Sequence, residues 1–503
     1  MGTAAVLALD QGTTGSTALV IGRDGRVLGR AYAEFTQHFP RPGWVEHDAE
    51  EIWAVTRDVA RAAVDRASGE ADLQAVGITN QRETVVLWDR ETLEPVHRAI
   101  VWQDRRTAGL CGELKAAGHE PRVREKTGLV LDPYFSGTKI RWILDAEPEL
   151  RNRAEAGELA AGTIDTWLIA RLSDGAVHAT DPTNASRTLL YDLRRRDWDE
   201  EMLRLFGVPR ALLPQVRPSS GDFGTTGGDF VGEELPVAGV AGDQQAALFG
   251  QGCHRAGEGK CTYGTGAFLL FNTGAEPRKS ERGLLTTLAC DAEGQAAYAL
   301  EGSIFIAGAA VQWLRDGLAI LEEADQTEAL ARSLDGNDGV YMVPAFVGLG
   351  APHWQPEARG TLTGLTRGTT RAHLARAALE AMAYGTRDVL GAMELDAGLK
   401  APSLKVDGGA TRNEWLLEFM AGVLGIPVHR PDMVETTALG AAGLAGLASG
   451  VWDSAEGFME AFGAGRSVSP TMEPEERREL VSGWERAVAA TLAAIPTSQS
   501  PTA

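Results

Sequence analysis

The first hundred residues alternate apolar runs with polar, glycine-containing turns. Three short runs rich in apolar and β-branched residues predict a β-meander, over residues 5–10, 17–21 and 27–35. Residues 48–67 then carry apolar side chains at helical spacing behind Asp48, a residue type that commonly caps helices. Residues 73–79 resemble a further strand. This pattern predicts an α/β fold with a mixed sheet.

A similar pattern returns after residue 240. Residues 260–274, KCTYGTGAFLLFNTG, predict a strand, a glycine-threonine turn and a second strand. A helix is expected to begin near Ile306, and the strand in SLKVDGGA leads into a helix over NEWLLEFMAGVLG. Because 503 residues exceed the size of one ordinary core, we predict two domains. They comprise residues 1–248 and 249–495, followed by a low-complexity tail, 496–503, predicted to be disordered.

The longest uncharged stretch runs from Thr436 to Trp452 and consists mainly of small residues. It falls short of the roughly 20 strongly apolar residues of a membrane span, so we expect a buried helix. The start of the chain shows no basic segment followed by an apolar one, and the four cysteines form no CxxC pair. These features predict a reduced, cytoplasmic protein without disulfides or membrane insertion.

Charge narrows the class of ligand. The chain has 48 Lys and Arg residues against 69 Asp and Glu residues, a formal net charge of -21. Such a balance disfavours nucleic acid and anionic membranes as partners, which leaves a small molecule as the expected substrate.

The turn within LALDQGTTGSTALVI, residues 7–21, combines a carboxylate, glycines and hydroxyls. Asp10 closes a buried strand, where a carboxylate beside open backbone amides suits a cation and an anion held together, as in Mg-nucleotide. The turn YGTG and the stretch VDGGATRN offer similar chemistry in the second half. We therefore expect two hairpins to hold one polyphosphate in a cleft between the domains. The chain has no GxxxxGK[ST] or strand-to-helix GxGxxG motif.

Twelve stretches together resemble the glycerol kinases, a group of the FGGY carbohydrate kinases, from about residue 5 to residue 490. They are ALDQGTTGS, GWVEHD, GITNQRET, VWQDRRT, DPYFSGTKIRW, GTIDTWL, TNASRTLL, AGDQQAALFGQ, TYGTG, VPAFVGLGAPHW, VDGGA and TALGAA. The resemblance implies two actin-like, ribonuclease-H-like domains around a cleft. It also implies ATP-dependent phosphorylation of glycerol to sn-glycerol 3-phosphate by direct in-line transfer.

The resemblance also implies roles for individual residues. Asp243 matches the general base, and Asp10 with Asp243 would hold Mg²⁺. Glycerol contacts are matched by Arg82, Glu83, Tyr134, Asp243 and Gln244, with Trp102 and Phe268 as an apolar wall. Nucleotide contacts are matched by Gly12, Thr13, Thr14, Gly15, Thr17, Thr265, Gly308, Gln312, Gly409 and Asn413. The residues alone would instead indicate an exposed ion pair at Arg82 and Glu83, core aromatics at Trp102 and Phe268, and a helix N-cap at Asp243.

Two stretches depart from the family's pattern. Many glycerol kinases carry arginine at the position of Thr17, where it can reach the phosphates. The stretch from Gly221 to Gly239 contains neither the arginine of relatives that bind fructose 1,6-bisphosphate nor the histidine of those that are phosphorylated. We therefore expect insensitivity to both. The resemblance further implies a homodimer or homotetramer.

Two alternatives stay open. One is a kinase for another polyol or a ketose, such as xylulose, ribulose or erythritol. The other is an actin-like or Hsp70-like nucleotide switch whose output is partner binding. His47 and His353 are expected to form structural hydrogen bonds rather than to bind a metal.

Overall fold

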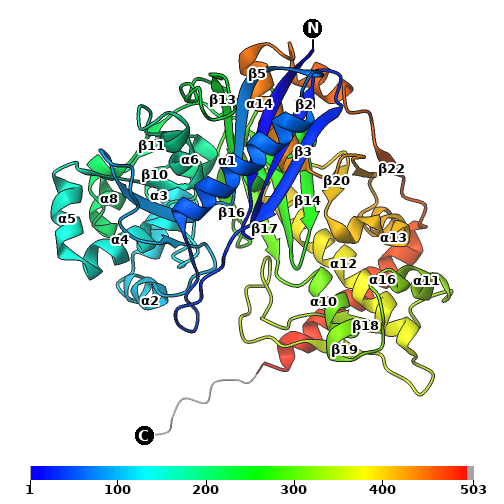
Figure 1. The fold of residues 1–503 in the computed structure, drawn as a ribbon. Helices are drawn as coiled ribbons and strands as arrows, with labels where there is room; N and C mark the ends of the chain where they lie inside the picture. The colour runs from blue at the N-terminus through cyan, green and yellow to red at the C-terminus, as the bar shows by residue number, and fades with distance from the viewer. Residues whose placement is uncertain (1, 496–503) are drawn as a thin grey trace, which may run out of the picture.

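The computed structural model describes residues 2–495, and its amino-terminal part is built on a five-stranded mixed sheet (Figure 1). The strands lie in the order β13-β5-β1-β2-β3. Their bounds are β1 (Thr3–Gln11), β2 (Gly15–Gly22), β3 (Val27–Glu34), β5 (Ala71–Asn80) and β13 (Val237–Gly242). β1, β2 and β3 pair antiparallel, whereas β5 lies parallel to both β1 and β13. The predicted meander and the strand that follows it are confirmed. The predicted tail, 496–503, lies outside the described residues.

Helix α1 (Ala49–Arg66) lies across this sheet. The Asp48 carboxylate accepts hydrogen bonds from the backbone N–H groups of Glu50 and Glu51, as expected of an N-cap. Its buried face, which includes Ile52 and Val59, packs into the hydrophobic core beneath the sheet. The predicted cap and helix are therefore confirmed.

The carboxy-terminal part contains a seven-stranded mixed sheet in the order β16-β17-β15-β14-β20-β21-β22. Its strands are β14 (Gly259–Tyr263), β15 (Ala267–Gly274), β16 (Leu285–Cys290), β17 (Ala296–Ile304), β20 (Leu404–Asp407), β21 (Val428–Arg430) and β22 (Arg466–Val468). A hairpin, β14 with β15, is extended antiparallel by β17 and parallel by β20. This arrangement repeats that of β1, β2, β3 and β5, so the predicted doubling of the fold is confirmed.

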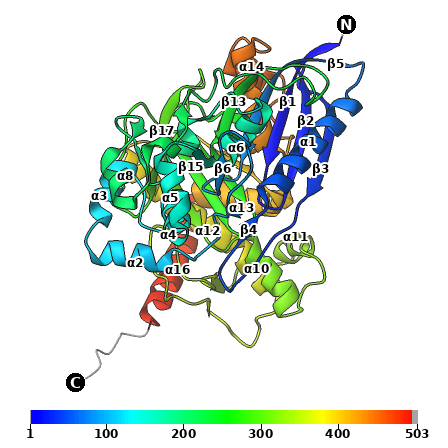
Figure 2. The same ribbon diagram turned by 60° about the vertical axis from the view of Figure 1, so that its left-hand side comes forward.

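Two helices lie where the two sheets approach each other, α9 (Asp243–Gly250) and α14 (Thr436–Ser449). α14 contacts α9 as well as β1, β5 and β13, although it is remote from those strands in sequence (Figure 2). A Cβ atom on Gly440 would lie 1.8 Å from the Ala246 carbonyl oxygen, so glycine permits this approach. The small-residue helix predicted for this stretch is confirmed. The predicted domain limit, residue 248, lies inside α9.

The remaining elements surround these sheets. Residues 81–236 lie mostly on the amino-terminal side, drawn in cyan and green in Figure 1. Beside β4 (Glu46–His47), this side holds β6 (Val85–Asp89), β7 (Ala99–Ile100), β8 (Leu159–Thr163), β9 (Ala179–Thr180), β10 (Tyr191–Asp192), β11 (Asp197–Trp198), β12 (Gln215–Val216), α2 (Ala108–Ala116), α3 (Glu120–Thr127), α4 (Ser136–Ala146), α5 (Pro148–Glu155), α6 (Ile164–Leu172), α7 (Pro182–Ala185), α8 (Glu200–Phe206) and η1 (Arg210–Leu212). The carboxy-terminal part adds β18 (Tyr341–Val343), β19 (Thr361–Thr363), α10 (Gly308–Gln312), η2 (Trp313–Gly317), α11 (Gln326–Arg332), α12 (Arg371–Ala397), η3 (Gly409–Arg412), α13 (Glu414–Leu424), α15 (Ala455–Glu460) and α16 (Pro474–Ala493).

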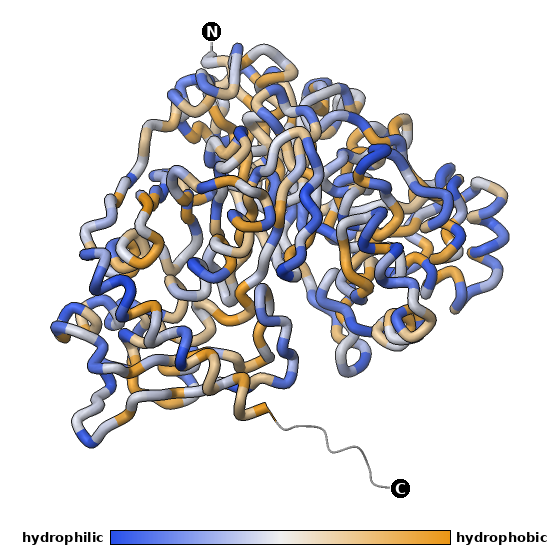
Figure 3. Tube along the Cα trace, turned by 180° about the vertical axis from the view of Figure 1, so that it is seen from behind, coloured by the Kyte–Doolittle hydropathy of each residue, from blue (hydrophilic) through white to orange (hydrophobic). Residues whose placement is uncertain are grey.

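Hydrophilic positions are frequent along the peripheral helices and loops, whereas the central strands are mainly apolar (Figure 3). Cys111, Cys253, Cys261 and Cys290 are all buried and free, which confirms the prediction that they form no disulfide. Within residues 2–495, no helix combines the length and apolar character needed to cross a membrane.

Candidate active site

Asp10 lies near the end of β1, and Asp243 is the first residue of α9. Asp10 Oδ2 accepts a hydrogen bond from the Thr437 hydroxyl of α14. Removal from water, together with the negative charges of Asp243 and Glu435, raises the pKa of Asp10 to about 6. The two carboxylates therefore repel each other across a common space, an arrangement that a divalent cation would relieve.

Asp243 is the first residue of α9, and the N-cap position belongs to Gly242. The reading of Asp243 as the N-cap is therefore wrong. Its side chain remains 32% exposed, although residues 245–250 of α9 are buried. Arg82 Nε lies 3.2 Å from Asp243 Oδ1, which fixes the carboxylate while leaving part of it accessible.

Arg82 and Glu83 are buried rather than exposed, so the surface ion pair expected from the residues alone is wrong. Both belong to a ring of alternating charges that Arg187 and Glu301 complete. Glu301 accepts from both arginines, with Oε2 2.6 Å from Arg82 Nη1 and Oε1 2.9 Å from Arg187 Nη2. Glu83 Oε1 accepts from Arg187 Nε at 2.6 Å and lies 3.8 Å from Arg82 Nε, which closes the ring. The charges of the two arginines and the two carboxylates cancel within this ring. Asp243 lies outside the ring and adds a further negative charge.

Sequence reasoning missed Arg187 and Glu301. Burial by itself raises the pKa of Glu301, but the guanidinium groups of Arg187 and Arg82 lower it to about 2. A signal was present in β17, because Glu301 is the one charged residue in the strand AAYALEGSI. An isolated charge in a buried strand requires a partner from elsewhere in the fold.

Tyr134 and Trp102 form an aromatic wall next to this ring. Their ring centroids lie 5.6 Å apart at an interplanar angle of 84°. Tyr134 Oη accepts a long hydrogen bond of 3.5 Å from Arg82 Nη2, and burial raises the pKa of this phenol. Trp102 Nε1 donates to Thr13 Oγ1 at 2.9 Å, so one side chain contacts both the wall and the first hairpin. Phe268 is half-buried on β15 of the other sheet, opposite Thr262 and Ser303.

The first hairpin turns between β1 and β2. The Gly12 N–H donates to the Gly15 carbonyl oxygen at 2.9 Å, and Thr14 is exposed at the tip. A Cβ atom on Gly15 would lie 2.6 Å from the Ala33 carbonyl oxygen, so a larger residue does not fit there. Thr17 pairs with Asp10 in the strand register, which directs both side chains to the same face of the sheet.

The second hairpin, Gly264 to Gly266, contacts the start of α10. The N–H groups of Ala307 and Gly308 donate to the carbonyl oxygens of Thr265 and Gly264, at 2.9 and 3.0 Å. Thr265 is exposed, as is Gln312 one helical turn beyond Gly308. The structure therefore brings these three predicted nucleotide residues together.

The stretch VDGGATRN lies beside this hairpin. Gly408 has φ +91° and a Cβ atom there would lie 2.1 Å from the Tyr263 carbonyl oxygen, whereas a Cβ on Gly409 would meet nothing within 4 Å. Gly408 is thus required by packing, and Gly409 leaves open space. Asn413 caps α13, because its side-chain oxygen accepts from the Leu416 N–H at 2.9 Å.

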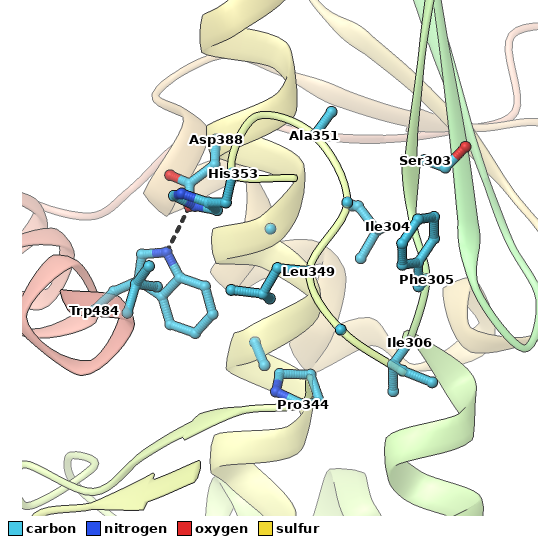
Figure 4. Close-up of a pocket in the computed structure, with 15 residues that line it drawn as sticks. Ser303, Ile304, Phe305, Ile306, Pro344, Leu349, Ala351, His353, Asp388 and Trp484 are labelled. Atoms are coloured by element: carbon cyan, nitrogen blue, oxygen red, sulfur yellow. Dashed lines mark hydrogen bonds and ion pairs between the residues drawn. The ribbon is translucent and has the colours of Figure 1, made fainter. Parts of the chain in front are cut away.

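A separate cavity of about 50 Å³ lies in the carboxy-terminal part, and none of the predicted site residues lines it (Figure 4). Trp484 Nε1 donates to Asp388 Oδ2 at 2.7 Å at its edge. His353 Nε2 lies 3.9 Å from the same carboxylate and has no hydrogen-bond partner within the described residues, so the structural hydrogen bond predicted for His353 is not found at this nitrogen. His47 Nε2 does form a structural hydrogen bond, 2.7 Å long, with Gln37 Oε1.

Between residues 2 and 495, no cluster of three or more His, Cys, Asp or Glu side chains is arranged to hold a metal ion.

Comparison with known proteins places the chain in a family. The models for the N-terminal and C-terminal domains of the FGGY family of carbohydrate kinases match residues 5–250 and 259–449. The chain belongs to the FGGY carbohydrate kinases. The predicted family and the two-domain α/β fold class are therefore confirmed, as is the prediction that the chain is a kinase.

Similar members of the family are glycerol kinases. The chain is 58% identical to the glycerol kinase of Dechloromonas aromatica over 484 residues, which are 96% of each protein. It is 55% identical to that of Deinococcus radiodurans over 96% of this chain and 97% of the relative. The crystal structure of Plasmodium falciparum glycerol kinase with ADP matches with a TM-score of 0.93 and 34% identity over 98% of this chain and 99% of that one.

Proposed function

We propose that this FGGY kinase transfers the γ-phosphoryl group of ATP directly to glycerol, in line, and forms sn-glycerol 3-phosphate. One observation carries the proposal beyond the similarity to glycerol kinases. Asp243 is a partly exposed carboxylate whose Oδ1 lies 3.2 Å from Nε of the buried Arg82. It directly follows β13, a strand of the same sheet as β1 and β2, which form the first hairpin. Phosphoryl transfer requires a base positioned near the attacking hydroxyl.

Asp243 acts in this proposal as the general base. It accepts the proton of the attacking glycerol hydroxyl as the new bond to phosphorus forms. Arg82 holds the carboxylate in one orientation, and the bonds of Arg82 to Glu301 keep the guanidinium itself in place. A fixed base reduces the rearrangement needed to reach the reactive geometry.

Glycerol recognition is assigned to the ring of alternating charges and to the aromatic wall. Arg82 supplies donors, Glu83 and Asp243 supply acceptors, and Gln244 supplies both. Tyr134, Trp102 and Phe268 are assigned to the carbon backbone of the triol. A site with buried polar groups rejects analogues that leave those groups unpaired, which favours glycerol over ligands with a different set of hydroxyls.

The nucleotide is assigned to the two hairpins and the open backbone at Gly409. Gly12, Thr13, Thr14, Gly15 and Thr17 would face the phosphates from one sheet, and Thr265 and Gly308 from the other. Gln312, Gly409 and Asn413 are assigned to the ribose and adenine. Mg²⁺, held by Asp10 and Asp243 in part through water, would offset the negative charge of the phosphates.

The deciding experiment measures ADP release with and without glycerol. We expect turnover that depends on glycerol and falls severalfold or more when xylulose, ribulose or erythritol replaces it. Preference for one of these sugars would indicate another kinase of the family. Equal ATP turnover without any polyol would favour a nucleotide switch instead.

The assembly is proposed to be a homodimer or a homotetramer, which only the family resemblance supports. Sedimentation velocity of the purified protein across a range of concentrations tests this. A monomer at all concentrations would contradict the proposal.

A further inference from the structure

Lys260 is a fully buried lysine next to the predicted substrate site. It lies on β14, and its side chain is shielded from water although no role was predicted for it. Lysine is rarely buried completely unless its charge has partners. Here Nζ donates to Gln244 Oε1 at 2.6 Å and to Thr262 Oγ1 at 2.7 Å, two neutral oxygens.

The contact with Gln244 determines which way that amide faces. An ammonium group can donate but not accept, so it can bind the oxygen of an amide and not its NH₂ group. Gln244 therefore has Oε1 directed to Lys260 and Nε2 directed away from it. Nε2 forms no hydrogen bond with a described residue, and the Gln244 side chain is only partly buried.

We propose that Lys260 is a positioning residue that fixes the Gln244 amide so that only N–H donors face the substrate. The inference rests on the proposed function, in which Gln244 contacts glycerol. It adds a residue from the carboxy-terminal sheet that controls hydrogen bonding by a residue of α9.

This arrangement has a consequence for the substrate hydroxyls. A hydroxyl that accepts a hydrogen bond from Gln244 Nε2 has its own proton left to donate. Asp243, the neighbour of Gln244, and Glu83 are the acceptors in the site. Lys260 thus favours one direction of hydrogen bonding, in which glycerol accepts from Gln244 and donates to a carboxylate.

The charges around Lys260 are compatible with this role. Burial lowers the pKa of its ammonium group, and the carboxylates of Asp407 and Asp243 oppose that effect, whereas Arg82 reinforces it. Cys261 and Glu301 are further titratable neighbours. The hydrogen bonds to Gln244 and Thr262 provide direct partners for the ammonium.

The first test is Lys260→Met, which keeps most of the length of the side chain and removes its donors. We expect KM for glycerol to rise about tenfold, the effect of losing one charge-assisted hydrogen bond, with kcat and KM for ATP changed less than about threefold. Lys405→Met is the matched control, because Lys405 pairs with Lys260 in the strand register and makes no predicted contact with substrate. We expect wild-type constants for this control.

A double-mutant cycle tests whether Lys260 acts through Gln244. If it does, Lys260→Met combined with Gln244→Ala should raise KM by less than about twofold over Gln244→Ala alone. Additive increases would overturn the proposal. So would an unchanged KM in Lys260→Met.

Gln244→Glu keeps the inference testable if Lys260→Met fails to fold. A glutamate retains the acceptor for Lys260 but lacks the N–H donors, so we expect undiminished thermal stability and KM for glycerol raised about tenfold. A wild-type KM in this variant would refute the proposed amide orientation. If the wild-type protein shows no glycerol-dependent ADP release, the proposed function fails instead.

Discussion

Arg82 and Glu301 are 219 positions apart in the sequence, yet Arg82 Nη1 and Glu301 Oε2 lie 2.6 Å apart. Arg82 follows β5 of the amino-terminal sheet, and Glu301 lies on β17 of the carboxy-terminal sheet. Both side chains are almost completely buried. The arginine that holds the proposed base is therefore held in turn by the opposite half of the molecule.

Glu301→Gln should weaken both the fold and substrate binding. It leaves Arg82 and Arg187 with uncompensated buried charge, and breaking a buried ion pair typically costs about 3–5 kcal/mol. We expect a lower thermal midpoint and KM for glycerol raised at least about tenfold, measured by calorimetry and coupled ADP assay. Glu418→Gln, which alters an exposed pair with Arg332, is the control and should change neither. Wild-type stability and KM in Glu301→Gln would contradict the positioning role.

Asp243→Asn should abolish most of the turnover while leaving binding largely intact. Loss of a general base commonly lowers the rate by about two to four orders of magnitude, and the amide keeps the shape of the carboxylate. Glycerol and ATP affinities, measured by calorimetry, are expected to stay within about tenfold of wild type. Turnover close to that of wild type would refute the assignment.

Thr17→Arg should tighten nucleotide binding. Residue 17 pairs with Asp10 at the base of the first hairpin. A guanidinium that reaches the phosphates would make the free energy of nucleotide binding more favourable by about 1–2 kcal/mol. Calorimetric titration with ATP and ADP measures the change, and Thr17→Met controls for side-chain length. Unchanged or weaker binding in a folded arginine variant would show that residue 17 does not face the phosphates.

Fructose 1,6-bisphosphate should have little effect on activity. The stretch from Gly221 to Gly239 has four carboxylates and no basic residue. The structure adds Arg61 from α1, but its Nη2 and Nε atoms already donate to the carbonyl oxygens of Asp229 and Phe230, at 2.6 and 2.8 Å. We expect millimolar bisphosphate to change ADP production less than about twofold. Severalfold inhibition that is lost when this stretch is altered would disprove the prediction.

Asp165 should make stability depend on pH. Burial, with the nearby charge of Asp181, raises its pKa from 3.8 to about 7, so the folded state binds a proton that the unfolded state has released. A raised folded pKa means that stability is lost as pH rises through 7. Between pH 6 and 8.5 the loss amounts to about 1 kcal/mol.

Asp165→Asn removes this titration. Its thermal midpoint should therefore fall less between pH 6 and 8.5 than that of the wild type, because all other groups contribute equally to both proteins. An identical pH dependence would show that Asp165 does not titrate in this range. Asp174→Asn, a change at an exposed position, is the control and should follow the wild type.

Patterns within short stretches of the chain were sufficient to predict the local structure and the family. The meander, the Asp48 cap of α1 and the hairpin at Gly264 to Gly266 depend on residues close together in the chain, so periodicity and turn composition reveal them. The motifs likewise identified Asp243 and the hairpin residues as candidates, since these residues lie within short characteristic stretches.

Tertiary structure alone decided which charges are buried and what they contact. Arg82 and Glu83 resemble an exposed pair until Arg187 and Glu301, more than 100 positions away, complete the ring around them. Lys260 and Gln244 are only 16 positions apart, yet they meet because the hairpin of one sheet packs against the helix that follows the other. Burial and ion pairing depend on contacts between segments remote in sequence, and local patterns of hydrophobic and polar residues do not encode which remote segments meet.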